Sequence, residues 1–196
     1  MLETRTPERV RRISGAARAT QPTLRLALEN IHDPHNVSAV FRTCDAAGAR
    51  VVSLIYNIEK FPKIGKKSSA SAYKWIERER HENATRCFEE YRERGFRVYV
   101  SALRKGAKNL YDLDLAKPSL ILLGNEHRGA SEEAIAAADE VFAIPMYGFV
   151  QSLNVSVSAA IILYEAVRQR REAGMYDEPQ LGEKELTELI DRWSEK

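Results

Sequence analysis

Continuous apolar runs alternate along the chain with segments in which apolar residues recur at every third or fourth position. The runs predict buried strands, and the spaced pattern predicts amphipathic helices. Strands are expected at 24–31, 51–56, 75–80, 96–103, 119–124 and 141–146, and helices at about 7–20, 36–47, 84–94, 132–139, 154–173 and 183–194. This alternation is typical of an α/β domain with a Rossmann-like, mostly parallel sheet.

Local signals place the ends of these helices. Thr6 is suited to cap the first helix and Pro7 to occupy its first turn, and Asn36 and Ser131 are the expected caps of two later helices. Three helices are expected to end at glycines, which take the left-handed conformation readily. These glycines are Gly48, Gly95 and Gly174.

Composition agrees with one folded domain. The 196 residues are 44% hydrophobic and 30% charged, as in an ordinary globular protein with a single core. No apolar stretch is long enough to span a membrane and no secretory signal is visible, so we expect a cytoplasmic protein without a membrane partner. Cys44 and Cys87 form no Cys-x-x-Cys motif, which indicates reduced thiols and no metal site.

Charge is unevenly distributed at the two ends. Residues 1–25 hold six arginines against two acids, whereas residues 177–196 hold seven acids against three bases. The basic arm is either a phosphate-binding surface or simply a solvated helix face. The candidate RNA-binding residues are Arg9, Arg11, Arg12 and Arg18.

Three polar stretches follow expected strands at the end where parallel sheets bind ligands. In the first, at 33–42, His35 lies in a turn, Asn36 opens a helix whose free N–H groups favour a phosphate, and Arg42 is a planar cation suited to clamp one. An ordinary cap and a salt-bridged arginine would give the same spacing.

The second and third stretches lie later in the chain. Gly124 and Gly129 flank four polar residues, so that backbone could approach a ligand closely, but the Gly-x-Gly start of a dinucleotide fingerprint is missing. That absence disfavours a nicotinamide-dependent oxidoreductase. In the third stretch, Ser152 and Asn154 could bond a sugar or base edge, or could cap the helix that follows.

Together the stretches resemble a known family. Asn-x-x-Ala-x-x-Arg at 36–42, Leu-Gly-Asn-Glu-x-x-Gly at 123–129 and Ile-Pro-Met…Ser-Leu-Asn-Val-Ser-Val at 144–157 match, in order and spacing, the three motifs of SpoU-class RNA 2′-O-methyltransferases of the SPOUT superfamily. The similarity extends over nearly the whole chain and is strongest to the tRNA (guanosine-2′-O-)-methyltransferases.

The resemblance implies a SPOUT fold with a C-terminal trefoil knot, an exception to the rule against threaded chains. It implies a core at 23–174 with helical extensions at 1–22 and 175–196, a homodimer with active sites at the interface, and S-adenosyl-L-methionine as cofactor. Ala102, Gly124, Ile144 and Leu153 would frame the cofactor. Asn36, Arg42, Glu126, Ser152 and Asn154 would form the catalytic pocket.

The implied reaction moves a methyl group from a sulfonium to a ribose 2′-oxygen in one in-line displacement. A sulfonium is already electrophilic, so no metal is predicted. The family's mechanism makes Arg42 the base, although a guanidinium stays protonated up to a pKa above roughly 12. Alternatively, Arg42 positions the phosphate and hydroxyl while His35 or Glu126 accepts the proton.

The expected substrate is tRNA, methylated at guanosine 18 of the D-loop. About 23 residues precede the first expected strand, too few for the additional RNA-binding domain that ribosomal-RNA members of the class carry. The alternatives are a ribosomal target, the tRNA wobble nucleotide, or a non-catalytic RNA-binding protein.

Overall fold

A seven-stranded sheet forms the centre of the computed structural model, which describes residues 6–63 and 72–196. The strand order is β3-β2-β1-β6-β4-β7-β5, and each neighbouring pair is parallel, which confirms the predicted α/β class. The strands are β1 (Leu24–Glu29), β2 (Val51–Ile55), β3 (Glu77–His81), β4 (Arg97–Ser101), β5 (Lys108–Asn109), β6 (Ser119–Leu123) and β7 (Glu140–Ala143).

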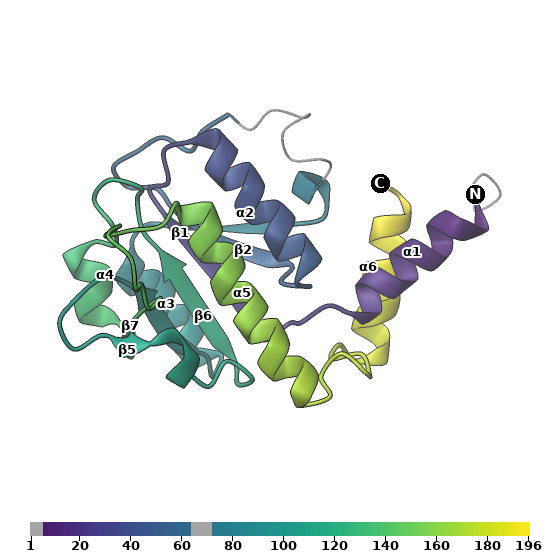
Figure 1. Ribbon diagram of the computed structural model, residues 1–196. Coiled ribbons are helices and arrows are strands. Elements are labelled where there is room, and N and C mark those ends of the chain that lie inside the picture. Colours follow the sequence, from purple (N-terminus) through teal and green to yellow (C-terminus); the bar gives the residue numbers. More distant parts are fainter. Residues whose placement is uncertain (1–5, 64–71) are drawn as a thin grey trace.

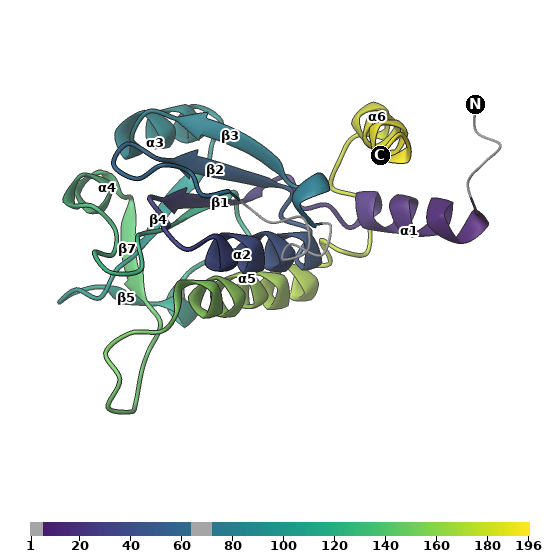
Figure 2. The same cartoon turned by 90° about the horizontal axis from the view of Figure 1, so that it is seen from above.

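Helices cover both faces of this sheet (Figures 1 and 2). One apolar core lies under α2 and α5, and a second lies under α3 and α4. Successive side chains of a strand lie on opposite faces of the sheet and so pack into the two cores alternately. Leu26 and Leu28 belong to the first core and Ala27 to the second. The helices are α1 (Pro7–Arg18), α2 (Pro34–Ala46), α3 (Ala84–Glu93), α4 (Glu132–Ala137), α5 (Val155–Glu172) and α6 (Glu183–Ser194), with 3-10 turns η1 (Ala72–Lys74) and η2 (Leu110–Asp112).

Most predicted boundaries agree with the structure to within a few residues, but the cap predicted for α2 is wrong. Helix α2 begins at Pro34 and is capped by Asp33, whose carboxylate accepts a hydrogen bond from the His35 N–H at 2.8 Å. Asn36 therefore lies inside the first turn, and its side chain is free for other contacts. The two-residue strand β5 was not predicted, because no periodicity can be detected over so short a segment.

Both terminal helices were predicted, and they pack against each other beside the sheet (Figure 1). Ile13 and Ala17 of α1 share an apolar cluster with Leu189 and Trp193 of α6. The ring of Trp193 meets that of Trp75, just after η1, edge to face at 5.5 Å. This cluster fastens the α1–α6 pair to the rest of the chain.

Arg170, near the end of α5, is completely buried. Its guanidinium donates to the backbone carbonyls of Thr23, Leu115 and Lys117 and to the side chains of Gln21 and Thr23. Burial lowers its pKa to about 10, so it remains charged at neutral pH. One cation thus joins the end of α5 to the segments that lead into β1 and β6.

The two cysteines are free and buried, in agreement with the predicted reduced thiols. Burial raises the pKa of both Cys44 and Cys87. Among the described residues, no helix is long and apolar enough to cross a membrane, and no group of three metal-ligating side chains is present.

Candidate active site

The second and third motif stretches line one cavity at the carboxyl ends of β4, β6 and β7. Its volume is about 620 Å³, within the range of small-molecule sites. All four predicted cofactor residues line it, as do three of the predicted catalytic residues. These seven are Ala102, Gly124, Ile144 and Leu153, and Glu126, Ser152 and Asn154.

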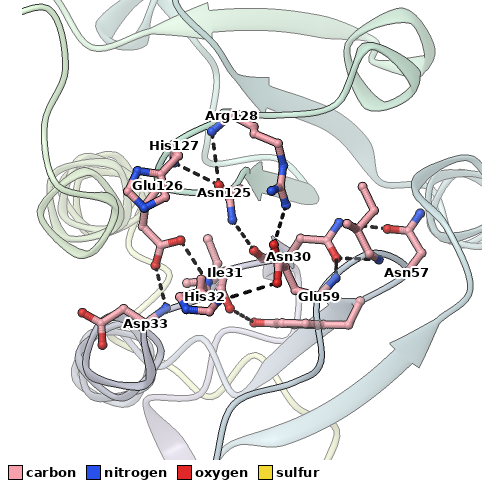
Figure 3. A network of polar contacts seen from close by, with 12 residues as sticks. Asn30, Ile31, His32, Asp33, Asn57, Glu59, Asn125, Glu126, His127 and Arg128 are labelled. Atoms are coloured by element: carbon pink, nitrogen blue, oxygen red, sulfur yellow. Dashed lines mark hydrogen bonds and ion pairs between the residues drawn. The ribbon is translucent and has the colours of Figure 1, made fainter.

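Glu126 joins the first motif to the second. Its carboxylate accepts hydrogen bonds from the backbone N–H groups of His32 (2.9 Å) and Asp33 (3.1 Å) and from the Asn36 amide (3.0 Å). Figure 3 shows the carboxylate pointing at this backbone. Burial alone would raise the pKa of Glu126, but the three donors outweigh it and hold the pKa below its ordinary value. The carboxylate is therefore ionised and fully engaged.

Asn36 joins the third motif to the first two. While its amide nitrogen donates to Glu126, its amide oxygen accepts from the Asn154 amide at 3.0 Å. The Asn154 oxygen in turn accepts from the backbone N–H of Ser156 and caps α5. One relay, Asn154 to Asn36 to Glu126, therefore fixes the three motifs relative to one another. Asn36 is buried, as such a role requires.

A second polar network, which the sequence did not reveal, holds the 124–129 loop against β1 and β2. The Asn125 amide donates to the Asn30 carbonyl at 2.6 Å, and its oxygen accepts from the N–H groups of His127 and Arg128. Asn30 has a positive φ of 52° and binds the backbone of the loop after β2 through its own side chain (Figure 3). The one sequence signal that could have indicated this network is that residue 30 is an asparagine, which adopts a positive φ more readily than most residues do.

Gly124 is required by the packing of its own loop, which the sequence did not reveal. A Cβ at this position would lie 2.1 Å from the Ala130 nitrogen and 2.3 Å from the Gly129 oxygen. The absent side chain therefore allows the loop to close on itself, through the paired backbone hydrogen bonds between Asn125 and Gly129. Gly129 has a φ of +72°, the left-handed region that favours glycine.

Three of the six predicted catalytic residues do not line the cavity: Asn36, which is bonded to two residues that do, and Arg42 and His35. Arg42 and His35 are exposed and are not among the residues that line it. They are seven positions apart and so lie on the same face of α2. In the described part of the chain the Arg42 side chain has no hydrogen bond or ion pair, so the salt-bridged alternative is not what the structure shows.

The four predicted RNA-binding arginines of α1 do not form one site. Arg9 and Arg12 line a different cavity, between α1, η1 and α6. Arg18 lies 3.9 Å from Glu178. Arg11 is exposed and lines neither cavity.

We predict that Glu126→Gln lowers the free energy of unfolding at neutral pH by about 1–3 kcal/mol, because one amide oxygen cannot replace a carboxylate facing three donors. A lowered pKa stabilises the fold above the ordinary glutamate value and loses that effect as pH falls through the folded-state pKa. The difference in free energy of unfolding between Glu126→Gln and wild type should therefore shrink below about pH 4.3. Urea unfolding at several pH values measures this, with exposed Glu132→Gln as control; a difference constant with pH would contradict it.

Gly124→Ala is predicted to destabilise the protein by about 1–3 kcal/mol, because the added methyl group collides with backbone atoms that cannot rotate away. Thermal unfolding measures the effect. Gly182→Ala is the control, since a Cβ there meets nothing within 4 Å. Equal melting temperatures for the two variants would show that the loop adapts.

Comparison with known proteins defines the class. The chain belongs to the SpoU methylase family: the model described as "SpoU rRNA Methylase family" matches residues 23–164. It is 44% identical over 195 residues to the tRNA (guanosine(18)-2′-O)-methyltransferase of Thermus thermophilus, covering all of both chains.

Solved structures agree with this assignment. The crystal structure of the Aquifex aeolicus TrmH/SpoU tRNA modifying enzyme has a TM-score of 0.90 and 37% identity, and covers 96% of this chain and 95% of its own. The SpoU methyltransferase AviRb from Streptomyces viridochromogenes, in complex with the cofactor AdoMet, has a TM-score of 0.66 and 25% identity over 79% of this chain and 59% of its own.

Proposed function

We propose that this protein transfers the methyl group of S-adenosylmethionine to the ribose 2′-oxygen of guanosine 18 in tRNA. The observation that carries the proposal is the relay that bonds Asn36 of the first motif to Glu126 and Asn154, which line the cavity. Its support is the family membership and the full-length similarity to relatives with that activity.

The cavity suits the proposed cofactor. Its wall includes residues of the 124–129 loop, whose closed shape depends on Gly124, and apolar side chains such as Ile144 and Leu153. The cofactor supplies an electrophilic methyl group on sulfur. The protein has to align a ribose hydroxyl with that group and to exclude other orientations.

Glu126 is better suited to positioning than to proton transfer. Its carboxylate already accepts three hydrogen bonds and its pKa is lowered, so it would take up a proton poorly. The candidates for the proton acceptor are then His35 and Arg42, on the exposed face of α2. Comparing the pH–rate profiles of His35→Ala and Arg42→Lys separates them, because loss of a titrating base removes one limb of the profile.

We further infer that the active site is completed by a second copy of this chain. Arg42 does not reach the cavity of its own chain, although the family's chemistry requires a phosphate-binding cation there. Apolar side chains are exposed beside α2, on the 144–154 loop and on α5. They are Tyr147, Phe149, Val150, Val157 and Tyr164. A homodimer would cover these side chains and would bring Arg42 of one copy to the cavity of the other.

The trefoil knot and the three-part division of the chain belong to the same proposal. Strand β6 lies between β1 and β4, β7 lies beyond β4, and α5 returns to pack on α2. The family model begins at residue 23, where the proposed core begins. Together with the TM-score of 0.90, these features support a threaded core at 23–174 between extensions at 1–22 and 175–196. A crystal structure with an unthreaded chain would contradict the knot.

The proposed activity is tested with an unmodified tRNA transcript, labelled S-adenosylmethionine and mass mapping of methylated riboses. The matched control is the same RNA with 2′-deoxyguanosine at position 18, which lacks the acceptor oxygen. We expect label at guanosine 18 of the first RNA and none on the second. Label at nucleotide 34, or only on ribosomal RNA, would favour the other SpoU-class targets instead.

A further inference from the structure

We propose that Glu59 is a positioning residue for the cofactor, because it holds Arg128 and thereby fixes the wall against which S-adenosylmethionine binds. The inference rests on the proposed function, since it concerns the methyl donor of that reaction. Residues 124–130 all line the cavity at the carboxyl ends of β4, β6 and β7, whereas Glu59 does not. Glu59 lies in the segment that follows β2 and approaches the 124–129 loop from outside the cavity (Figure 3).

The first half of this loop is well anchored to the rest of the molecule. The Asn125 amide donates to the Asn30 carbonyl at 2.6 Å, and the Glu126 carboxylate accepts hydrogen bonds from two backbone N–H groups just before α2. The second half, residues 127–129, forms its backbone hydrogen bonds to Asn125, inside the loop. These bonds shape the second half but do not fasten it to another segment.

Arg128 supplies that fastening. Its guanidinium donates a hydrogen bond to the Glu59 carboxylate at 2.9 Å, and Figure 3 shows the guanidinium directed at this carboxylate. Among residues 6–63 and 72–196, no other hydrogen bond or ion pair joins residues 127–129 to a segment outside the loop. Arg128 lines the cavity, so this one pair connects the wall to a residue that does not touch the ligand.

Glu59 is itself held in place by Asn30. The side-chain oxygen of Asn30 accepts hydrogen bonds from the backbone N–H groups of Ile58 (3.1 Å) and Glu59 (3.0 Å). The Nδ1 atom of His32 also lies 3.6 Å from the Glu59 carboxylate. The hydrogen bond from Arg128 lowers the pKa of Glu59, so the carboxylate is ionised at neutral pH. A carboxylate on a fixed backbone loses less freedom when it pairs than one on a mobile segment does, which favours the pair.

A wall that is already fixed binds its ligand more tightly, because less freedom is lost on binding. Breaking the Glu59–Arg128 pair should therefore weaken cofactor binding. It should leave the chemical step intact once the cofactor is bound, because Glu126 keeps its own three hydrogen bonds. An interaction that acts equally on the ground state and the transition state changes KM and leaves kcat unchanged.

Calorimetric titration of the full chain with S-adenosylmethionine, without RNA, tests the inference. Glu59→Gln and Arg128→Gln are each expected to raise the Kd about two- to five-fold, the contribution of a partly exposed ion pair. The double variant should bind no more weakly than Arg128→Gln alone, because both substitutions remove the same contact. In methyl transfer, Glu59→Gln should raise the KM for the cofactor while kcat stays within a factor of about two.

A second ligand separates positioning from simple charge attraction. S-adenosylmethionine carries a net positive charge, whereas S-adenosylhomocysteine lacks the methyl group and is neutral. If the two residues acted only through their charges, Glu59→Gln would weaken S-adenosylmethionine alone and Arg128→Gln would strengthen its binding. Positioning predicts instead that each variant weakens both ligands by the same factor.

Glu89→Gln is the matched control, because it breaks an exposed pair with Arg86 on α3 and should leave both affinities unchanged. Circular dichroism confirms that each variant is folded. The inference is overturned by wild-type affinity in Glu59→Gln, by effects that multiply in the double variant, by weakening of S-adenosylmethionine alone, or by a fall in kcat at unchanged KM. The titration gives its answer whichever RNA is methylated. A wild-type chain that binds no S-adenosylmethionine would contradict the proposed function as well, whereas equal binding by wild type and Glu59→Gln overturns this inference alone.

Discussion

Replacing Arg42 by alanine is expected to reduce methyl transfer by roughly 100- to 1000-fold or more, the usual effect of removing a charged group that acts on the reacting centre. The side chain is exposed and makes no hydrogen bond or ion pair in the described part of the chain, so stability should be unchanged. Single-turnover methyl transfer at saturating tRNA measures the effect on the chemical step. Arg86→Ala is the control, and full activity of Arg42→Ala would refute the proposed role.

The same variant tests whether two copies share one site. Leu153→Trp, which should fill the proposed cofactor cavity, is expected to be inactive for a different reason. Random exchange between the two inactive variants makes about half of the dimers mixed, and each mixed dimer has one intact site of two, so about a quarter of wild-type activity should return. If Arg42 serves the cavity of its own chain, no activity returns.

The largest effect on stability is expected for Arg170→Met. The substitution removes a buried charge but leaves the Leu115 carbonyl and the Gln21 amide oxygen without donors. The carbonyls of Thr23 and Lys117 lose one bond each and keep another from Ser119. Each unsatisfied acceptor costs about 1–3 kcal/mol, and relief from burying the charge offsets part of the total, so we expect a net loss of roughly 2–4 kcal/mol.

Urea unfolding at fixed protein concentration measures this loss, because the stability of the proposed dimer would depend on concentration. Arg171→Met is the matched control, since the adjacent side chain is exposed and its replacement should change stability by less than about 0.5 kcal/mol. Similar urea midpoints for the two variants would show that water satisfies the Leu115 carbonyl and the Gln21 amide oxygen.

Local periodicity predicted the fold class, and the resemblance of three motifs to the SpoU class predicted the residues of the cavity. Strand and helix periods are visible over five residues or more, and the three motifs are continuous segments at the ends of strands. Ser131 and Pro7 are where the capping rules placed them. The cap of α2 was wrong because Asp33 and Asn36 are both good capping residues, and only Pro34 between them favours the earlier start.

Other features depend on contacts between distant parts of the chain. Arg170 lies in a basic run that looks solvent-exposed, and only the meeting of α5 with residues 21–23 and 115–117 buries it. The separation of Arg42 from the cavity also follows from tertiary packing. The cavity beside α1 joins residues from both ends of the chain with η1, a combination that no local pattern indicates.

The edges of the sheet have a consequence for self-association. Strand β3 forms one edge with the alternating charges Glu77, Arg78, Glu79 and Arg80, and the other edge, β5, is only two residues long. Arg78 of this strand lies over the ring of Tyr73, with its guanidinium carbon 3.7 Å from the ring centre. Neither edge is a good template for a strand from another molecule. Fibre-like growth by strand addition is therefore disfavoured, and the proposed homodimer would form through helices and loops rather than through a sheet edge.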